Sequence, residues 1–174
     1  MSDPLRILLV DDHALFREGL ASLLSYQPDM EVVGEAEDAA SAVEAACRLR
    51  PDLTLMDIDL PDADGIAATR AIAADHPTLN IAMLTVHDDE AMLFAALKAG
   101  ARGYLLKSVR SAEFVPQVRE MARGGAAISR RMAGRILEEF GPRDAEGLLF
   151  EPAERLTSRE LEILQLVIAR CTNR

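Results

Sequence analysis

Short apolar runs that alternate with helix-like segments constrain the fold of this chain more than any other feature. The runs are too short for typical helices and are bounded by acidic or turn-forming residues, as expected for strands buried on both faces of a sheet. They predict strands at Leu5–Val10, Met30–Ala36, Leu53–Met56, Asn80–Val86 and Ala101–Lys107. Apolar residues at helical spacing, with Pro or Gly at several ends, predict helices within residues 15–24, Asp38–Arg50, Gly65–His76, Asp89–Gly100 and Ser111–Gly125.

The alternation of strand and helix over residues 1–124 predicts an α/β fold built on one five-stranded parallel sheet. Parallel strands joined by helices require right-handed crossovers, which place helices on both faces of the sheet. In such a doubly wound sheet, ligands bind beyond the carboxyl ends of the strands. The residues at those ends are therefore the first candidates for a functional site.

The chain has 29 acidic and 19 basic side chains, a net charge of −10 that is unevenly distributed. Residues 1–124 carry 21 acidic and 11 basic side chains, whereas the C-terminal remainder is neutral. An acidic body is a poor surface for nucleic acid, because contacts to phosphates dominate that affinity. We therefore expect any contact with DNA to come from the C-terminal part. With no apolar stretch long enough for a membrane span and no signal peptide, we also expect a cytoplasmic protein without membrane contact.

Five side chains of complementary chemistry stand at the expected carboxyl ends of four strands. They are Asp11 and Asp12 after the first strand, Asp57 after the third, Thr85 at the end of the fourth and Lys107 at the end of the fifth. Carboxylates that converge from two strand ends repel one another, and a hard divalent cation such as Mg²⁺ would relieve that repulsion. A hydroxyl and an ammonium can both bind an anionic oxygen. These are the parts needed for phosphoryl transfer to a carboxylate.

In order and spacing, these residues resemble the receiver domain of bacterial two-component response regulators. The motifs are Asp11-Asp12, Asp57 within "LMDIDLPDADG", Thr85 after "IAML" and Lys107 in "GYLLKS". The resemblance covers Leu5 to about Gly124 and implies a flavodoxin-like fold with strand order 2-1-3-4-5. It further implies signalling rather than turnover of an external substrate, so the chain is expected to catalyse only its own phosphorylation and dephosphorylation.

The resemblance also assigns roles within the site. It implies that Asp57 is the phosphoacceptor, which takes its phosphoryl group from a sensor histidine kinase. It implies that Asp12 and Asp57 hold Mg²⁺, with Asp11 acting through water and the backbone carbonyl of Asp59 as a further ligand. The four aspartates of "DIDLPDAD" would then differ in role, with Asp62 and Asp64 expected to be turn and helix-start residues before the next helix.

The remaining family positions concern switching and the lifetime of the phosphoryl group. Thr85 and Lys107 are implied to grip the phosphoryl group, and Tyr104 matches the aromatic residue that changes rotamer when the threonine moves. Asp59 and His87 stand where the family tunes dephosphorylation, and His87 is either an exposed loop residue or a group that orients water. Proline often follows the lysine in this family, and Ser108 in its place leaves that peptide geometry open.

The C-terminal part contains a predicted helical linker at residues 125–155 and a second motif at residues 156–174. Thr157 and Glu160 form a capping box, followed by an amphipathic helix. The spelling is similar to the start of the LuxR-type helix-turn-helix of NarL/FixJ-type regulators, with Arg170 where the family usually has Gly. The recognition helix that would enter the major groove is absent from the sequence. We therefore expect specific DNA binding only from a complete output domain, and a homodimer on phosphorylation.

Two other interpretations remain at the level of the sequence. "DID" at residues 57–59 resembles the nucleophile motif of haloacid-dehalogenase-like phosphatases, which also form an aspartyl phosphate. That family has Gly-Thr next and an acidic pair after the lysine strand, whereas here Leu60-Pro61 follow and the pair lies on the first strand. The other alternative is a stand-alone receiver that acts through protein–protein contacts.

Overall fold

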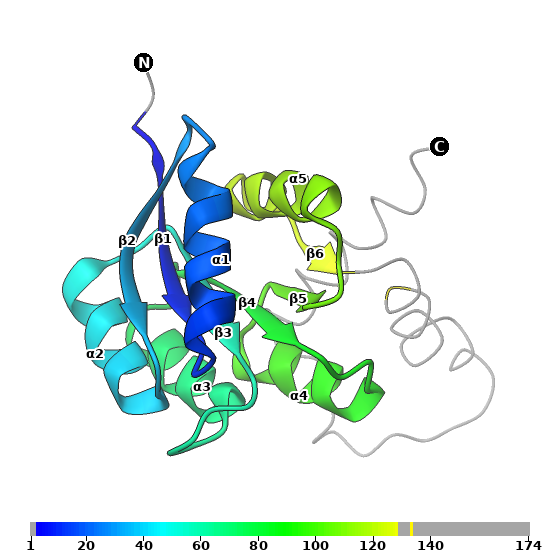
Figure 1. Ribbon diagram of the computed structural model, residues 1–174. Helices are drawn as coiled ribbons and strands as arrows, with labels where there is room; N and C mark the ends of the chain where they lie inside the picture. Colours follow the sequence, from blue (N-terminus) through cyan, green and yellow to red (C-terminus); the bar gives the residue numbers. More distant parts are fainter. Residues whose placement is uncertain (1–2, 129–132, 134–174) are drawn as a thin grey trace, which may run out of the picture. The chain divides into compact units, whose positions relative to one another are not determined.

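The computed structural model describes residues 3–128 and residue 133 (Figure 1). The chain divides into two compact units, Met1–Ala127 and Ile128–Arg174, and the first of them carries the candidate site. The predicted helix-turn-helix start and the predicted linker beyond residue 128, apart from Ala133, lie outside the described residues. The elements are β1 (Leu5–Val10), α1 (Ala14–Ser25), β2 (Met30–Ala36), α2 (Ala39–Leu49), β3 (Leu53–Asp57), α3 (Gly65–Asp75), β4 (Asn80–Thr85), α4 (Glu90–Ala99), β5 (Gly103–Leu106), α5 (Ser111–Ala122) and β6 (Ala127–Ile128).

The strands form one sheet in the order β2-β1-β3-β4-β5-β6. The pairings from β2 through β5 are all parallel, so the predicted sheet and its order 2-1-3-4-5 are confirmed. The structure adds β6 at the edge of the sheet, where the sequence predicted the start of a linker. A strand of two residues is too short to produce an apolar run in the sequence. Only its place beside β5 in the sheet identifies it as a strand.

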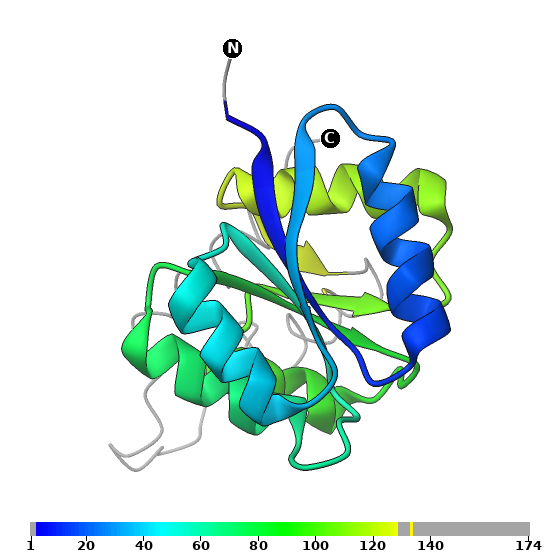
Figure 2. The ribbon, with the colours of Figure 1, turned by 60° about the vertical axis from the view of Figure 1, so that its left-hand side comes forward.

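The helices cover both faces of the sheet, as expected from the alternating pattern. Helices α1 and α5 lie on one face, and α2, α3 and α4 lie side by side on the other (Figures 1 and 2). In the part of the chain that the structure describes, no helix is both long enough and apolar enough to cross a membrane.

The central strands are buried between these helix layers, and β3 is buried along its whole length. Alternate side chains of the central strands join α1 and α5 in one apolar cluster, because successive residues of a strand point to opposite faces. The cluster includes Ile7, Leu9, Leu53, Leu55, Leu84, Leu24, Phe114 and Val118. Interiors of this kind pack tightly and resist deformation, so the strand ends above the core are held in fixed positions.

Two aspartates of the loop after β3 accept hydrogen bonds from N–H groups at the start of a helix, and each contacts a different helix. The Asp64 carboxylate accepts a 2.8 Å hydrogen bond from the backbone N–H of Ile66 and caps α3, as predicted. The Asp62 carboxylate instead accepts hydrogen bonds of 2.7 and 3.1 Å from the N–H groups of Ala39 and Ala40, at the start of α2. These bonds, that of Ala39 first, lower the pKa of Asp62. Asp62 thus lies in the bend before α3, as predicted, but its carboxylate contacts the start of α2, which the sequence did not indicate.

Candidate functional site

The register of the sheet brings the carboxyl ends of four strands to one level. Val10 of β1 pairs with Met56 of β3, and Thr85 of β4 pairs with Leu106 of β5. The pairing of β3 with β4 places the ends of these two strands at the same level as well. The residues that close or directly follow these strand ends are Asp11, Asp12, Asp57, Thr85 and Lys107.

Lys107 lies between two buried carboxylates. Its Nζ donates a 2.6 Å hydrogen bond to Asp57 Oδ2 and lies 2.8 Å from Asp11 Oδ2 as an ion pair. The side chains of Asp57 and Asp11 are 1% and 2% exposed, and that of Lys107 is 12% exposed. Charges this well shielded from water interact more strongly than surface pairs do. The predicted convergence of carboxylates and lysine on one point is thus what the structure has.

Burial and the contacts between opposite charges act in opposite directions on the pKa values of Asp57 and Lys107. Burial raises the pKa of Asp57, and the negative charge of Asp11 adds to this, while Lys107 acts against both without offsetting them. For Lys107, burial disfavours the ammonium, but its contacts with Asp11 and Asp57 outweigh that effect and raise its pKa. Lys107 is therefore a firmly protonated cation, and Asp57 is a carboxylate whose charge is poorly solvated.

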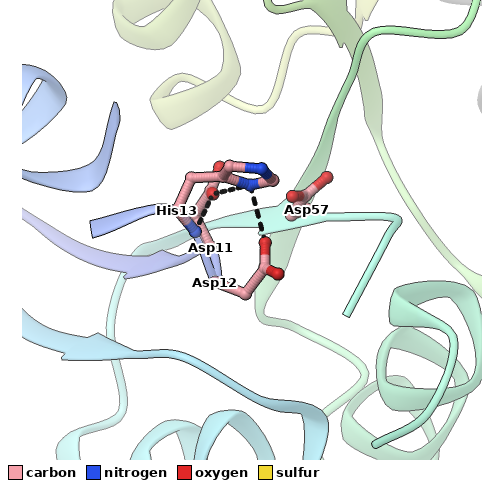
Figure 3. Close-up of side chains that lie close together, drawn as sticks. All are labelled: Asp11, Asp12, His13 and Asp57. Carbon is pink, nitrogen blue, oxygen red and sulfur yellow. Dashed lines mark hydrogen bonds and ion pairs between the residues drawn. The ribbon is translucent and has the colours of Figure 1, made fainter. Parts of the chain in front are cut away.

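Asp12 and His13 form the more open side of the site. Asp12 is 35% exposed, and His13 Nδ1 lies 2.7 Å from Asp12 Oδ1 and 3.4 Å from Asp11 Oδ1. Figure 3 shows the imidazole lying over both members of the acidic pair, with Asp57 beside them. His13 was not predicted as a site residue. Its position directly after the two aspartates was the signal, since the chain turns there from β1 into α1.

The donor set around Asp57 fits a divalent cation. Asp11, Asp12, His13 and Asp57 each offer a ligand atom, and these atoms lie within 4.8 Å of one another. Carboxylate oxygens are the ligands that Mg²⁺ prefers, and it keeps several waters in addition. Asp11 Oδ1 accepts a 2.9 Å hydrogen bond from the N–H of His13, and Asp11 Oδ2 pairs with Lys107. Because both of its oxygens have partners, Asp11 is less available than Asp12 to bind a cation. The role of the Asp59 carbonyl stays a prediction.

Thr85 and Tyr104 meet through the backbone of His87. The N–H of His87 donates a 3.0 Å hydrogen bond to Thr85 Oγ1, and its carbonyl accepts one of 3.1 Å from the Tyr104 hydroxyl. Thr85 and Tyr104 are 0% and 1% exposed. Burial raises the pKa of Tyr104 to about 12, so this hydroxyl keeps its proton. The loop after β4 is therefore anchored at His87 by the two residues that the sequence assigned to switching.

Asp59 and His87, in the loops after β3 and β4, contact each other at the surface. His87 Nε2 lies 3.0 Å from Asp59 Oδ2, and the two side chains are 44% and 53% exposed. The N–H of Asp59 also donates a 3.3 Å hydrogen bond to Asp57 Oδ1. The two positions that the sequence paired only by their offsets from Asp57 and Thr85 are thus in direct contact, and one of them also touches the central carboxylate.

Two side chains of α1 support the site, and the sequence analysis missed both. Arg17 donates from Nη1 to the backbone carbonyl of Asp11 and from Nε to Glu35 Oε2 at 2.8 Å. The ring of Phe16 lies 4.8 Å from Lys107 Nζ, within the range of a cation–π contact. Helical spacing places both on the first turns after the acidic pair, but their contacts depend on rotamers that spacing does not specify.

The peptide after Lys107 is trans, because no cis peptide bond occurs among the described residues. The loop is instead held by hydrogen bonds of its backbone. The N–H of Lys107 donates to the carbonyl of Thr85 at 2.7 Å, and that of Val109 donates to Leu106 at 3.0 Å. The open question that Ser108 raised in the sequence is thus answered by ordinary turn geometry.

Comparison with known proteins identifies the family. A family model described as the response regulator receiver domain matches residues 7–119. The chain belongs to the response regulator family. Among curated relatives of this response regulator, the transcriptional regulatory protein LiaR of Bacillus subtilis is 39% identical over 170 residues, which cover 98% of this chain and 79% of that protein. The transcriptional regulatory protein DegU of Brevibacillus brevis is 35% identical over 182 residues, covering 98% of this chain and 77% of DegU.

Solved structures give the same family and the same fold. A LuxR-family two-component response regulator from Aurantimonas sp. SI85-9A1 superposes with a TM-score of 0.74 at 38% identity, covering 79% of this chain and 99% of that one. The receiver domain of a putative NarL regulator from Mycobacterium tuberculosis superposes with a TM-score of 0.68 at 36% identity, covering 71% and 99%. The chain is therefore a receiver-containing response regulator of the NarL/LuxR type. The two curated relatives are transcriptional regulatory proteins, and the Aurantimonas neighbour is a two-component response regulator.

Proposed function

We propose that this response regulator accepts a phosphoryl group on Asp57 from a phosphohistidine of a sensor kinase. In that step an Asp57 carboxylate oxygen attacks phosphorus, an O–P bond forms, and the histidine N–P bond breaks. The electron pair of the N–P bond returns to the imidazole of the kinase, which then takes up a proton. The observation that carries the proposal is the placement of Lys107, whose Nζ lies 2.6 Å from Asp57 Oδ2 and within reach of an incoming anionic oxygen.

Mg²⁺ would be the cation of this reaction, and Asp11, Asp12, Asp57 and the Asp59 carbonyl are the groups that would hold it. When bound, it neutralises charge on the transferring group and on the carboxylates around it. The remaining work falls to the protein. Asp57 is shielded from water by the strand ends, Lys107 pairs with the phosphoryl oxygens, and the Thr85 hydroxyl donates a hydrogen bond to one of them.

Phosphorylation switches the protein by shifting a population. The phosphoryl group favours one arrangement of Thr85, and Thr85 is linked to Tyr104 through the His87 backbone. Only the difference in binding between the two arrangements can move the equilibrium. The phosphorylated protein forms a homodimer in the cytoplasm. This homodimer controls transcription through a complete DNA-binding domain. Asp59 and His87 set the lifetime of the phosphoryl group.

The test is labelling by a small phosphodonor, acetyl phosphate, in the presence of Mg²⁺, followed by intact-mass spectrometry. The expected result is one phosphoryl group per chain, lost on treatment with hydroxylamine, which cleaves acyl phosphates. Asp57→Asn should abolish this labelling, whereas Asp59→Asn should retain it. Full labelling of Asp57→Asn would overturn the assignment.

The same preparation addresses the dimer and the phosphatase alternative. Gel filtration with and without beryllofluoride and Mg²⁺ should show a larger species only in the presence of beryllofluoride, and only when Asp57 is intact. Continuous turnover of a phosphate ester would favour a phosphatase, whereas a single labelling event favours the receiver. An unchanged elution volume with beryllofluoride bound would remove the homodimer from the proposal.

A further inference from the structure

His13 begins α1 without serving as its cap. The residue occupies the N-cap position, yet its side chain makes no capping hydrogen bond to the first turn of the helix. The ring is turned back toward the acidic pair instead, and Nδ1 lies 2.7 Å from Asp12 Oδ1 (Figure 3). An N-cap side chain usually satisfies an N–H group of the first turn. The His13 imidazole thus points toward the candidate cation site and does not cap the helix.

The spacing of the donors is that of neighbouring ligands on one cation. Two ligands in adjacent positions of an octahedron with bonds of about 2.1 Å lie about 3 Å apart. His13 Nδ1 lies 2.7 Å from Asp12 Oδ1, close to that value. The His13 side chain is 69% exposed, so small rotations of the ring are not opposed by packing. One cation can therefore replace the contacts that now join Nδ1 to the carboxylates.

We propose that His13 Nδ1 is a nitrogen ligand of the cation site and gives it a preference for Mn²⁺, Co²⁺ and Ni²⁺ over Mg²⁺. The inference rests on the proposed cation site beside Asp57 and specifies which ions that site selects. Mg²⁺ gains little from an imidazole, because it favours oxygen ligands and holds its waters firmly. Imidazole suits transition ions such as Ni²⁺, and the affinities of a given site rise from Mn²⁺ to Co²⁺ and Ni²⁺.

The other two histidines of the chain are placed differently. His87 contacts Asp59 and is not part of the group of ligand atoms around Asp57. His76 directly follows α3 and precedes β4, so it lies at the opposite end of the sheet from Asp57. His76→Asn is therefore a matched control for the loss of one imidazole from this protein.

The experiment measures the binding of Mg²⁺, Mn²⁺ and Ni²⁺ by calorimetry, at a pH above the ordinary imidazole pKa of about 6.5. It compares the complete chain with its His13→Asn and His76→Asn variants. Asparagine is a good N-cap, so His13→Asn preserves the helix start and replaces the imidazole nitrogen donor by an amide oxygen. Circular dichroism verifies the fold of each variant. The electron paramagnetic resonance of bound Mn²⁺ reports nitrogen coupling directly.

The expected result is a fall in Ni²⁺ affinity of about ten-fold or more in His13→Asn, with the Mg²⁺ affinity within about two-fold of the original. Nitrogen coupling to Mn²⁺ should be present in the original chain and in His76→Asn, and absent in His13→Asn. Equal effects on Ni²⁺ and Mg²⁺, or no nitrogen coupling in the original chain, would overturn the proposal. If no protein bound Mg²⁺ at all, the proposed cation site itself would fail, which is a different outcome.

Discussion

Lys107 Nζ lies 2.6 Å from Asp57 Oδ2, yet the pKa of Asp57 is raised rather than lowered. Burial is the larger effect, and the neighbouring charge of Asp11 adds to it. The folded protein therefore holds an ionised carboxylate at a cost in stability at neutral pH. Such a carboxylate is better stabilised after it gains a cation or a phosphoryl group, which is the situation that a phosphoacceptor requires.

The cost of ionised Asp57 should appear in its amide variant. A raised pKa in the folded state means that its stabilising effect is present below the unfolded value of 3.8 and is lost as pH rises through the folded pKa. Asp57→Asn should therefore have a higher free energy of unfolding than the original protein at neutral pH. The gap should close as pH falls through the raised pKa toward 3.8.

Urea unfolding at a series of pH values measures this gap. Glu44→Gln, at an exposed position of α2, is the control and should shift the free energy of unfolding by less than about 0.5 kcal/mol. A gap of the same size at every pH would show that the ionisation of Asp57 is not its source.

Removal of the ammonium should destabilise the protein. In Lys107→Met, two buried carboxylates lose their shared cation, and loss of one partner from a buried pair costs about 3 kcal/mol. Lys98→Met, at an exposed position of α4, removes the chain's other lysine and should cost less than about 0.5 kcal/mol. Thermal unfolding with and without Mg²⁺ measures both effects. Mg²⁺ should restore part of the loss at Lys107, and equal costs for the two variants would contradict this account.

Gly65 is required by the backbone beside the phosphoacceptor. A Cβ at this position would lie 1.9 Å from the carbonyl oxygen of Asp57, which is a backbone atom and cannot rotate away. Gly65→Ala should therefore lower the free energy of unfolding by about 1–3 kcal/mol and slow labelling of Asp57. Gly19→Ala, on the exposed side of α1 with no atom within 4 Å, should raise it by about 0.5–1 kcal/mol. Chemical denaturation should give opposite signs, and a fall for both would count against the steric explanation.

The positions of Asp57, Thr85 and Lys107 could be predicted because they depend on features that the sequence states directly. Each closes or follows a buried run, and parallel strands of similar length end at one edge of the sheet. The pairs Val10–Met56 and Thr85–Leu106 show the register that makes this inference work.

The misses have a common physical cause. The attachment of Asp62 to α2 and the turning of His13 toward Asp12 depend on loop paths and rotamers, which neither hydrophobic period nor strand order determines. Likewise, β6 exists only through its place beside β5, since two residues alone carry no strand signal. Site residues on strands or directly after them, such as Asp57 and Lys107, were thus predictable, whereas contacts set by side-chain rotamers, such as that of His13 with Asp12, were not.

Tyr104 should titrate only in strongly alkaline solution. Its pKa is raised from 10.0 to about 12, first by burial and then by acidic residues nearby. Because the folded pKa lies above the unfolded one, its stabilising effect is present below pH 10 and is lost as pH rises toward about 12. Ultraviolet absorbance of tyrosinate in a Tyr26→Phe variant isolates this residue, since the chain has two tyrosines. A midpoint near 10 while the fold is intact would contradict the buried position of the ring.

His87→Ala should lengthen the lifetime of the phosphoryl group on Asp57. Its imidazole lies 3.0 Å from Asp59 Oδ2, where the two side chains can hold a water molecule against the acyl phosphate. The substitution leaves both backbone hydrogen bonds of His87 in place, so Thr85 and Tyr104 keep their link. Loss of an orienting group should slow hydrolysis by about ten-fold, less than the 10²–10⁴-fold expected of a full general base. Mass spectrometry over time gives the half-life, with His76→Ala as the control, and an unchanged half-life in His87→Ala would remove His87 from the reaction.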